Sequence, residues 1–366
     1  MIHCEHCSAR AAAALVQLDS KSSYLCRPCT EAVQAQHSDA CLCDACGKHA
    51  TVKTLNKDGK PFSVCAACLT AHAPLSDASS SKRSKKSRSS SSSSSKASTA
   101  STPQVGYAAE QGRRSTMEDA EVLVSDLHAL FPEHAPVGSQ FYGVYDGHGG
   151  QRAAEFVKQT LHHKIVACDA FKAGRFADAV KAGYAACDDE LLKICDAGAW
   201  QDGTTAVVAL LVDGQLITSC VGDSELVVCV GGAAQCRSFK HKPNEPAERA
   251  RIQAAGGVVL FNRLGASMAV SRAFGDKIHK HPFNGAPADH MSAEPFIDIM
   301  PLDDVEYLIL ACDGVWDHVT YDASVQCVSK LKTEGKSAEE AARALVQASL
   351  DGGSADNCTA IVVYLK

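Results

Sequence analysis

The chain has 366 residues, of which 46% are hydrophobic and 21% charged, a composition typical of a globular protein with more than one domain. It has no apolar run of the roughly 18 to 20 residues that a membrane span needs, and its N-terminus lacks the basic start and apolar core of a secretion signal, so we expect a soluble cytoplasmic or nuclear protein. The net charge of −6 divides into +6 over residues 1–103 and −12 over the remainder, and an acidic half suits cation binding.

The first 75 residues repeat a pattern of paired cysteines. Within each copy 18 residues separate two Cys-x2-Cys pairs, and all four cysteines recur with a period of 39. The first copy contains Cys4, Cys7, Cys26 and Cys29, and the second contains Cys43, Cys46, Cys65 and Cys68. Four thiolates at this spacing are typical of a closed structural zinc site, and units this small need the metal to fold. We therefore predict two zinc units, residues 1–40 and 41–75, with one structural Zn²⁺ each.

These units resemble B-box-type or zinc-ribbon-like fingers, without a clear match to either subtype. A nucleic-acid surface is not expected, because the segment through residue 75 has nearly balanced charge and only Tyr24 and Phe62 as aromatic residues. We therefore expect the fingers to bind a protein partner.

Residues 76–103 consist almost entirely of Ser, Lys, Arg, Ala and Thr. Such a segment cannot bury enough apolar surface to offset its ordering entropy, which predicts a disordered linker. Its basic tract, Lys82-Arg83-x-Lys85-Lys86-x-Arg88, is compatible with a nuclear-import signal, a polyanion contact or a solvated tether.

Residues 104–366 contain apolar strand patterns interrupted by pairs of helical patterns. Strands are predicted at 119–125, 139–145, 204–212, 215–221, 225–230, 306–312 and 358–365, and helices at about 151–167, 175–196, 322–333 and 337–350. Because the helices come in consecutive pairs, the pattern favours sheets covered by helix pairs, an α+β fold, over regular βαβ winding.

Five predicted strand ends carry carboxylates. Asp146-Gly147 and Asp313-Gly314 directly follow apolar strands, and Glu118-Asp119, Asp223 and Asp356-Asn357 lie at three others. If these ends meet, their charges repel one another unless cations intervene, and all-oxygen ligands favour Mg²⁺ or Mn²⁺ over zinc. Two such ions can share a water, lower its pKa and hold a phosphoryl group for in-line displacement.

Eight motifs in residues 105–366 resemble, in the same order, those of the metal-dependent protein phosphatase family, also called protein phosphatase 2C. They lie at 114–120, 144–150, 202–206, 221–224, 241–243, 268–276, 311–317 and 354–357. The resemblance implies a four-layer α-β-β-α sandwich of two antiparallel sheets flanked by helix pairs. It also implies an enzyme that hydrolyses phosphoserine and phosphothreonine in proteins by direct attack of a water bridging two Mg²⁺ or Mn²⁺ ions. No cysteine or serine occupies the position of a nucleophile with an adjacent base, so we expect no phosphoenzyme. We also expect a monomer.

The resemblance also implies a set of metal ligands. Asp146 would bridge the two ions. Glu118 and the carbonyl of Gly147 would bind one ion, and Asp313 and Asp356 the other.

Further roles follow from the same motifs. Asp119 would orient a water, while Asp223 and Asp317, together with Asp313, match positions that can hold a weaker third ion. Arg114 matches the residue that grips the substrate phosphate, and His148 matches the general acid that protonates the leaving oxygen. Five other motif residues are interpreted as structural: Thr204, Thr205, Ser271, Arg272 and Asp276.

Two positions depart from the family pattern. Glu225 stands where the family usually has Arg after Gly-Asp-Ser, and Lys240 stands where it usually has Asp before His-Lys-Pro. Neither position is a predicted metal ligand, so we expect an active enzyme. The alternative is a pseudophosphatase that acts as a binding module, with these two positions as signs of drift.

Overall fold

The computed structural model describes residues 14–18, 21–25, 53–57, 60–64 and 103–366. The chain divides into two units, residues 1–98 and residues 99–366, which we call the N-terminal and catalytic units and describe separately. All eight cysteines predicted to bind zinc lie outside the described residues, as does most of the predicted linker. Among the described helices, none is long and apolar enough to cross a membrane.

Two antiparallel hairpins are described in the N-terminal unit. β1 (Ala14–Leu18) pairs with β2 (Lys21–Leu25), and β3 (Lys53–Lys57) pairs with β4 (Lys60–Val64). Both hairpins have the same length and register, and each strand of the second begins 39 residues after its counterpart in the first. The repeat seen in the cysteines therefore recurs in the backbone, and each hairpin falls between two Cys-x2-Cys pairs in the sequence.

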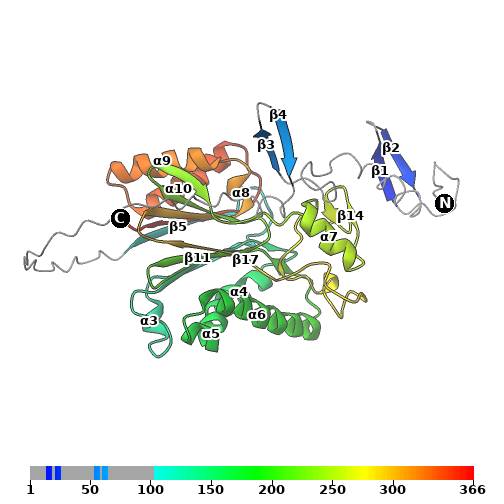
Figure 1. Cartoon of the computed structure of the whole chain (residues 1–366), viewed down its shortest axis with the longest axis horizontal. Helices are drawn as coiled ribbons and strands as arrows, with labels where there is room; N and C mark the ends of the chain where they lie inside the picture. Colours follow the sequence, from blue (N-terminus) through cyan, green and yellow to red (C-terminus); the bar gives the residue numbers. More distant parts are fainter. Residues whose placement is uncertain (1–13, 19–20, 26–52, 58–59, 65–102) are drawn as a thin grey trace, which may run out of the picture. The chain divides into compact units, whose positions relative to one another are not determined.

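Two five-stranded antiparallel sheets form the centre of the catalytic unit (Figure 1). The first sheet has the order β17 (Phe296–Pro301), β11 (Gln215–Val221), β10 (Ala206–Val212), β7 (Gln140–Tyr145) and β6 (Ala120–Val124). The second has the order β13 (Ala233–Cys236), β12 (Glu225–Val230), β18 (Val305–Ala311), β19 (Cys358–Tyr364) and β5 (Gln104–Glu110). The central strands β7, β10 and β19 are buried along their whole length, which explains their nearly continuous apolar sequences.

The helices cover the outer faces of the two sheets. In Figure 1, α4 (Arg152–Ala167) and α6 (Phe176–Gly198) lie on the side of the first sheet, and α9 (Tyr321–Thr333) and α10 (Ala338–Asp351) on the side of the second. The short helices α3 (Leu127–Leu130), α5 (Asp169–Lys172) and α8 (Asp313–Trp316) complete these layers. The predicted α+β fold with antiparallel sheets and covering helices is confirmed.

Side-chain alternation along β7 shows how the layers join. Phe141 and Tyr145 belong to the apolar core beneath α4 and α6, whereas Tyr142 and Val144 belong to the core shared with the second sheet. Because successive side chains of a strand point to opposite faces, one strand supplies both cores.

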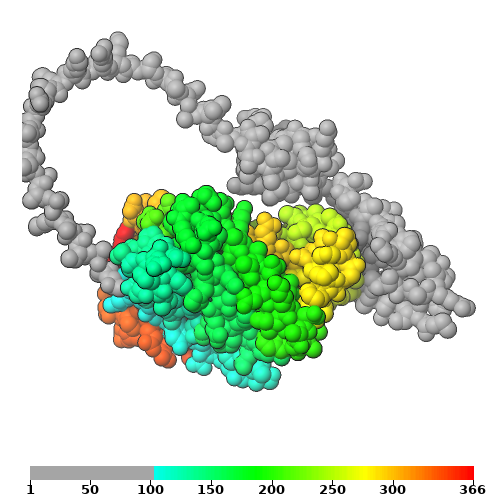
Figure 2. Space-filling view, turned by 90° about the horizontal axis from the view of Figure 1, so that it is seen from below, coloured from blue at the N-terminus to red at the C-terminus, as the bar shows by residue number. Residues whose placement is uncertain are grey.

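A loop region between β13 and β17 contains smaller elements. They are α7 (Pro246–Ala254), β14 (Val259–Leu260), β15 (Arg263–Leu264), β16 (Phe274–Gly275) and the 3-10 helix η2 (Lys277–His279). β16 joins β9 (Gly203–Thr204) and β8 (Gly147–His148) in a small three-stranded sheet. In Figure 2 the yellow residues of this region lie side by side with the green surface of α4 and α6. Through the small sheet, the loop region is connected to Gly147 and His148, the residues that follow Asp146.

Candidate active site

Three aspartates from three strand ends meet in the catalytic unit. Asp146 follows β7, Asp223 follows β11 by two residues, and Asp313 begins α8 two residues after β18. One carboxylate oxygen of each lies within 4.8 Å of one from each of the other two. Since β7 and β11 belong to the first sheet and β18 to the second, packing of the two sheets creates this cluster.

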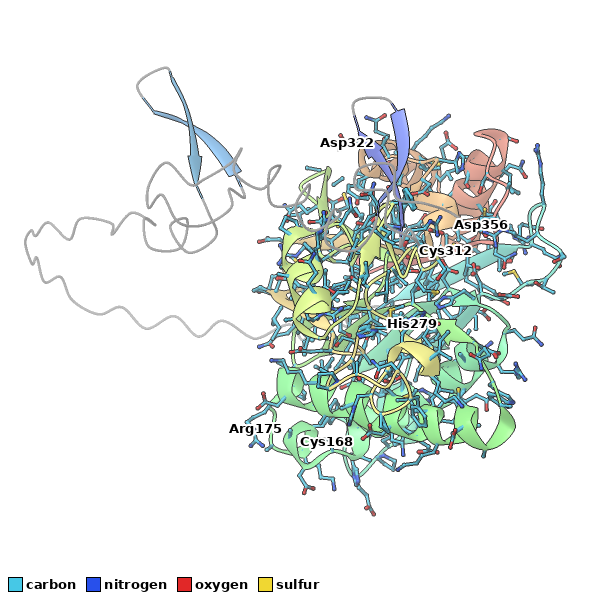
Figure 3. The ribbon with its side chains drawn as sticks, turned by 90° about the vertical axis from the view of Figure 1, so that its right-hand side faces the viewer. Cys168, Arg175, His279, Cys312, Asp322 and Asp356 are labelled. Atoms are coloured by element: carbon cyan, nitrogen blue, oxygen red, sulfur yellow. The ribbon has the colours of Figure 1, made fainter. Side chains whose placement is uncertain are left out.

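The cluster lines a cavity of about 510 Å³. Of the residues predicted for the site, the cavity lining includes Arg114, Glu118, Asp146, Gly147, His148, Asp223, Asp313 and Asp356. Figure 3 shows Cys312, next to Asp313, near Asp356, with His279 of the loop region below them; His279 also lines the cavity. Residues spread over more than 240 positions of the sequence are thus brought to one concave surface.

The electrostatics of the cluster fit a site for cations. Burial, followed by the charges of Asp119, Asp313 and other neighbours, raises the pKa of Asp146 well above its usual value. Burial and the charges of Asp223 and Asp317 raise the pKa of Asp313 to about 7. Crowded, buried carboxylates are costly as anions, and divalent cations relieve that cost.

Asp119 supports the same interpretation. Burial is the main cause that raises its pKa to about 6. Thr359, Cys312 and Asp146 lie nearby, yet neither oxygen of Asp119 accepts a hydrogen bond of regular geometry from the part of the chain that is described. A buried carboxylate without donors requires a partner, and ordered water or a cation would supply one. The all-oxygen set of donors fits Mg²⁺ or Mn²⁺.

Glu118 and Gly147 lie against each other at one side of the cluster. Glu118 accepts hydrogen bonds from the Thr116 hydroxyl (2.9 Å) and the Gly150 N–H (3.2 Å). A Cβ at Gly147 would lie within 3.0 Å of the Glu118 carbonyl oxygen. Glycine is therefore needed here because another backbone segment passes close by, in addition to any role of its carbonyl.

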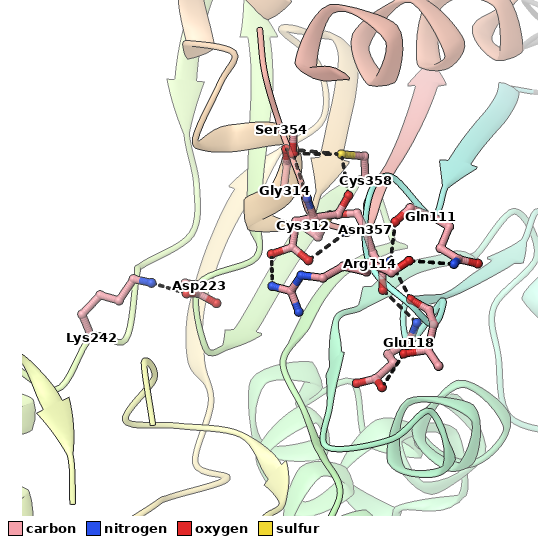
Figure 4. A network of polar contacts seen from close by, with 12 residues as sticks. Gln111, Arg114, Glu118, Asp223, Lys242, Cys312, Gly314, Ser354, Asn357 and Cys358 are labelled. Carbon is pink, nitrogen blue, oxygen red and sulfur yellow. Dashed lines mark hydrogen bonds and ion pairs between the residues drawn. The ribbon is translucent and has the colours of Figure 1, made fainter. Parts of the chain in front are cut away.

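Arg114 and Asp356 are joined by a hydrogen-bonded ion pair of 2.7 Å between Nη2 and Oδ2. The neighbouring Asn357 fixes this part of the site: its side-chain amide donates to the carbonyls of Gln111 and Thr116, and its Oδ1 accepts from the N–H of Glu118. Figure 4 shows this network. Asn357 was not assigned a role from the sequence, although its place beside Asp356 in a motif was a usable signal.

The residues predicted for a third ion are placed differently. Asp223 belongs to the aspartate cluster and forms an ion pair with Lys242 (Figure 4). Asp317 lies outside the cluster, with 62% of its side chain exposed, and its Oδ1 is 3.8 Å from the ammonium of Lys240. A lysine therefore faces each of these two carboxylates.

His148 has a carboxylate partner that was interpreted as structural. Its Nε2 lies 2.8 Å from Oδ2 of Asp276. Although burial alone disfavours the charged imidazolium, the charge and hydrogen bond of Asp276 raise the pKa of His148 above its usual value. The structure thus joins the predicted general acid to an acidic residue 128 positions away.

The other residues interpreted as structural have the following contacts and burial in the catalytic unit. Thr205 pairs with Ser224 at 2.7 Å, the side chain of Thr204 donates to the Thr205 carbonyl, and Arg272 forms an ion pair with the buried Glu248. Ser271 is fully buried.

The comparisons with known proteins agree with the geometry. A family model described as protein phosphatase 2C matches residues 104–358. The probable protein phosphatase 2C 59 of rice is 40% identical over 265 residues, covering 70% of this chain and 74% of the rice protein. The probable protein phosphatase 2C 59 of Arabidopsis thaliana is 39% identical over 263 residues, covering 70% and 78%. Protein spalten of Dictyostelium discoideum is 36% identical over 278 residues, which are only 28% of its length.

A solved structure also has the same fold. The crystal structure of serine-threonine phosphatase 2C from Toxoplasma gondii superposes with a TM-score of 0.62 at 25% identity, over 72% of this chain and 95% of that one. The fold and the acidic cavity define a metal-dependent phosphatase of phosphoserine and phosphothreonine. The chain belongs to the protein phosphatase 2C family.

Proposed function

We propose that the catalytic unit removes phosphate from serine and threonine side chains of proteins, using two Mg²⁺ or Mn²⁺ ions. The observation that carries this proposal is the convergence of Asp146, Asp223 and Asp313 at the cavity, whose lining also includes Arg114 and His148. The cavity thus combines a site for cations with a fork-shaped donor for phosphate and a group that can transfer a proton.

The metal ligands are proposed as follows. Asp146 would be shared by two ions, Glu118 and the Gly147 carbonyl would hold one of them, and Asp313 and Asp356 would hold the other. When bound, the ions would lower the pKa of a coordinated water and offset the charge of the phosphoryl group.

The remaining residues act on water and substrate. Asp119, whose oxygens lack donors among the described residues, orients a water by accepting its hydrogen. Asp223 and Asp317 would contribute, with Asp313, to a weaker third site.

Arg114 binds the phosphate group. Its side chain is 61% exposed and lies at the cavity, so part of its guanidinium is free to contact a substrate while Nη2 remains on Asp356. A planar guanidinium can donate two parallel hydrogen bonds to phosphate oxygens. His148 donates a proton to the serine or threonine oxygen as that oxygen departs.

The test is a phosphatase assay on a phosphothreonine peptide with Mn²⁺ or with EDTA. We expect turnover with Mn²⁺, loss with EDTA, and loss in Asp146→Ala. Asp178→Ala is a matched control, because it removes an exposed carboxylate of α6. Activity that survives EDTA or Asp146→Ala would refute the proposal.

We also propose that the N-terminal unit contains two structural zinc sites that dock the enzyme to a protein partner. Support comes from the shared 39-residue period of the cysteines and the hairpins. Zinc analysis of the full chain by mass spectrometry under native conditions should find two ions, and Cys26→Ser should lose one of them. A chain with one zinc ion or none would contradict the two-unit interpretation. We further propose that the protein acts as a monomer in the cytoplasm or nucleus.

A further inference from the structure

The His148–Asp276 pair is built by the small three-stranded sheet. Gly203 of the middle strand β9 is paired with His148 of β8 on one side and with Gly275 of β16 on the other. A Cβ at Gly203 would lie within 3.0 Å of both His148 Nε2 and Asp276 Oδ2. The absence of a side chain at Gly203 therefore leaves the space in which the two side chains meet.

The carboxylate of Asp276 is held in place by its surroundings. Its side chain is only 4% exposed, and its N–H donates to the Asp202 carbonyl at 3.1 Å. Its backbone is in the left-handed region, with φ of +50°. This conformation is uncommon for a residue with a side chain, so the surrounding contacts must maintain it.

A buried ion pair anchors the preceding residue. Asp188 of α6 accepts the N–H of Gly275 on one oxygen (2.8 Å) and the ammonium of Lys280 on the other (2.6 Å). Lys280 is fully buried and also donates to the Ala273 carbonyl. A charged pair whose hydrogen-bonding groups are satisfied in this way ties the 273–280 segment to a rigid helix.

We propose that Asp276 is the positioning residue for His148 in phosphate-ester cleavage, an inference that rests on the function proposed above. It accepts the hydrogen on Nε2 and thereby fixes the ring, so that Nδ1 is the nitrogen that delivers a proton at the cavity. A histidine oriented by a carboxylate presents one defined tautomer and direction to the reacting atoms.

The reaction step conserves atoms and charge. The oxygen of water forms a new bond to phosphorus, and the proton that this water gives up passes to solvent. The bond between phosphorus and the serine or threonine oxygen breaks, and its electron pair stays on that oxygen. The departing oxygen takes the proton from Nδ1 of His148, and solvent returns a proton to the ring. Asp276 retains its hydrogen bond to Nε2 throughout.

The dependence of the rate on the leaving group tests this role. An alkoxide leaving group needs a proton, whereas p-nitrophenolate is a stable anion that needs none. In Asp276→Asn, kcat on a phosphothreonine peptide should fall by about 10- to 100-fold, while kcat on p-nitrophenyl phosphate should change by less than about 3-fold. His148→Gln should show the same selectivity. The double variant should be no slower than the slower single variant, because both residues act in one step.

Two further variants complete the experiment. Gly203→Ala should push the pair apart and give the same selective loss, and Asp196→Asn, which removes an exposed carboxylate beside Lys277, should change neither rate. The ratio of the two rates does not depend on the folded fraction, so partial unfolding does not obscure it. Equal loss on both substrates, or additive effects of Asp276→Asn and His148→Gln, would overturn the role of Asp276. A wild-type protein inactive on both substrates with Mn²⁺ would instead refute the proposed function.

Discussion

The ammonium of Lys240 lies 3.1 Å from Oε1 of Glu225, and these are the two positions at which the chain departs from the usual family motifs. The contact is an ion pair, since Oε1 accepts no hydrogen bond of regular geometry from a described residue. The other oxygen of Glu225 accepts the Tyr321 hydroxyl at 2.6 Å. Glu225 thus replaces the usual Arg and Lys240 replaces the usual Asp, so the two charges are exchanged and the two side chains form an ion pair. This favours compensation over the independent drift expected of a pseudophosphatase.

A double-mutant cycle on this pair should show coupling. The Glu225 side chain is 3% exposed, so Lys240→Met should leave a buried carboxylate without its cation and destabilise the catalytic unit by roughly 1 to 3 kcal/mol. The variant with Glu225→Gln and Lys240→Met together should be less destabilised than the sum of the single variants. Urea unfolding followed by tryptophan fluorescence reports this unit, because both tryptophans of the chain, Trp200 and Trp316, belong to it. Additive free energies would show that the two residues do not interact.

The main elements of the catalytic unit were predictable because each has a local pattern. The predicted strands 215–221 and 225–230 coincide with β11 and β12, and the predicted helices 151–167 and 322–333 begin within one residue of α4 and α9. Strongly periodic, buried segments carry this information in their own sequence.

Other elements carried too little local signal. β17 is a partly exposed edge strand that ends on Pro301, and the strands of the small sheet have two residues each. The pairing of His148 with Asp276 spans 128 positions, so no sequence window contains both residues. The family motifs indicated which aspartates form the cluster. The hydrogen-bond partners of the site side chains could be identified only from the structure, because they are far apart in the sequence.

Replacing Asp146 should stabilise the metal-free catalytic unit and weaken its stabilisation by Mn²⁺. Burial and neighbouring carboxylates raise the pKa of Asp146, so its charge opposes folding when no cation is bound. Asp146→Asn should therefore raise the melting temperature in EDTA by a few degrees, roughly the effect of 1 kcal/mol. The same variant should lose most of the stabilisation that Mn²⁺ gives to the wild type. Thermal unfolding with EDTA and with Mn²⁺ measures both effects, and Asp178→Asn is the control. A lower melting temperature in EDTA would contradict the proposed repulsion.

Arg114 should matter for substrate binding and turnover. Removal of its guanidinium takes away a charged, fork-shaped donor at the cavity, so Arg114→Ala should lower kcat/KM on a phosphothreonine peptide by about 10- to 100-fold. Arg114→Lys should restore only part of the loss, because an ammonium is a point charge without the fork. Arg113→Ala removes the exposed neighbouring arginine and should have little effect. An equal loss in both alanine variants would indicate a general charge effect.

His162 should make the stability of the catalytic unit depend on pH. It lies on α4 against Phe131 and Phe141, and its Nδ1 is buried without a hydrogen-bond partner among the described residues. Burial, together with the neighbouring His163, lowers the pKa of His162 from 6.5 to about 4. The unfolded chain binds the proton of His162 more tightly than the folded chain does. The contribution of neutral His162 to the free energy of unfolding is therefore fully present above pH 6.5 and is lost as the pH falls to about 4.

The variant His162→Phe should therefore lose less stability than the wild type across this window. The difference between the two proteins in the change of unfolding free energy from pH 7 to pH 4 should be roughly 2 kcal/mol. Urea unfolding at several pH values measures it, and His134→Phe provides a half-buried histidine on a neighbouring loop for comparison. Parallel pH profiles for the wild type and His162→Phe would show that His162 remains able to take up its proton in the folded state. That outcome would contradict the lowered pKa that follows from the burial of the ring against Phe131 and Phe141.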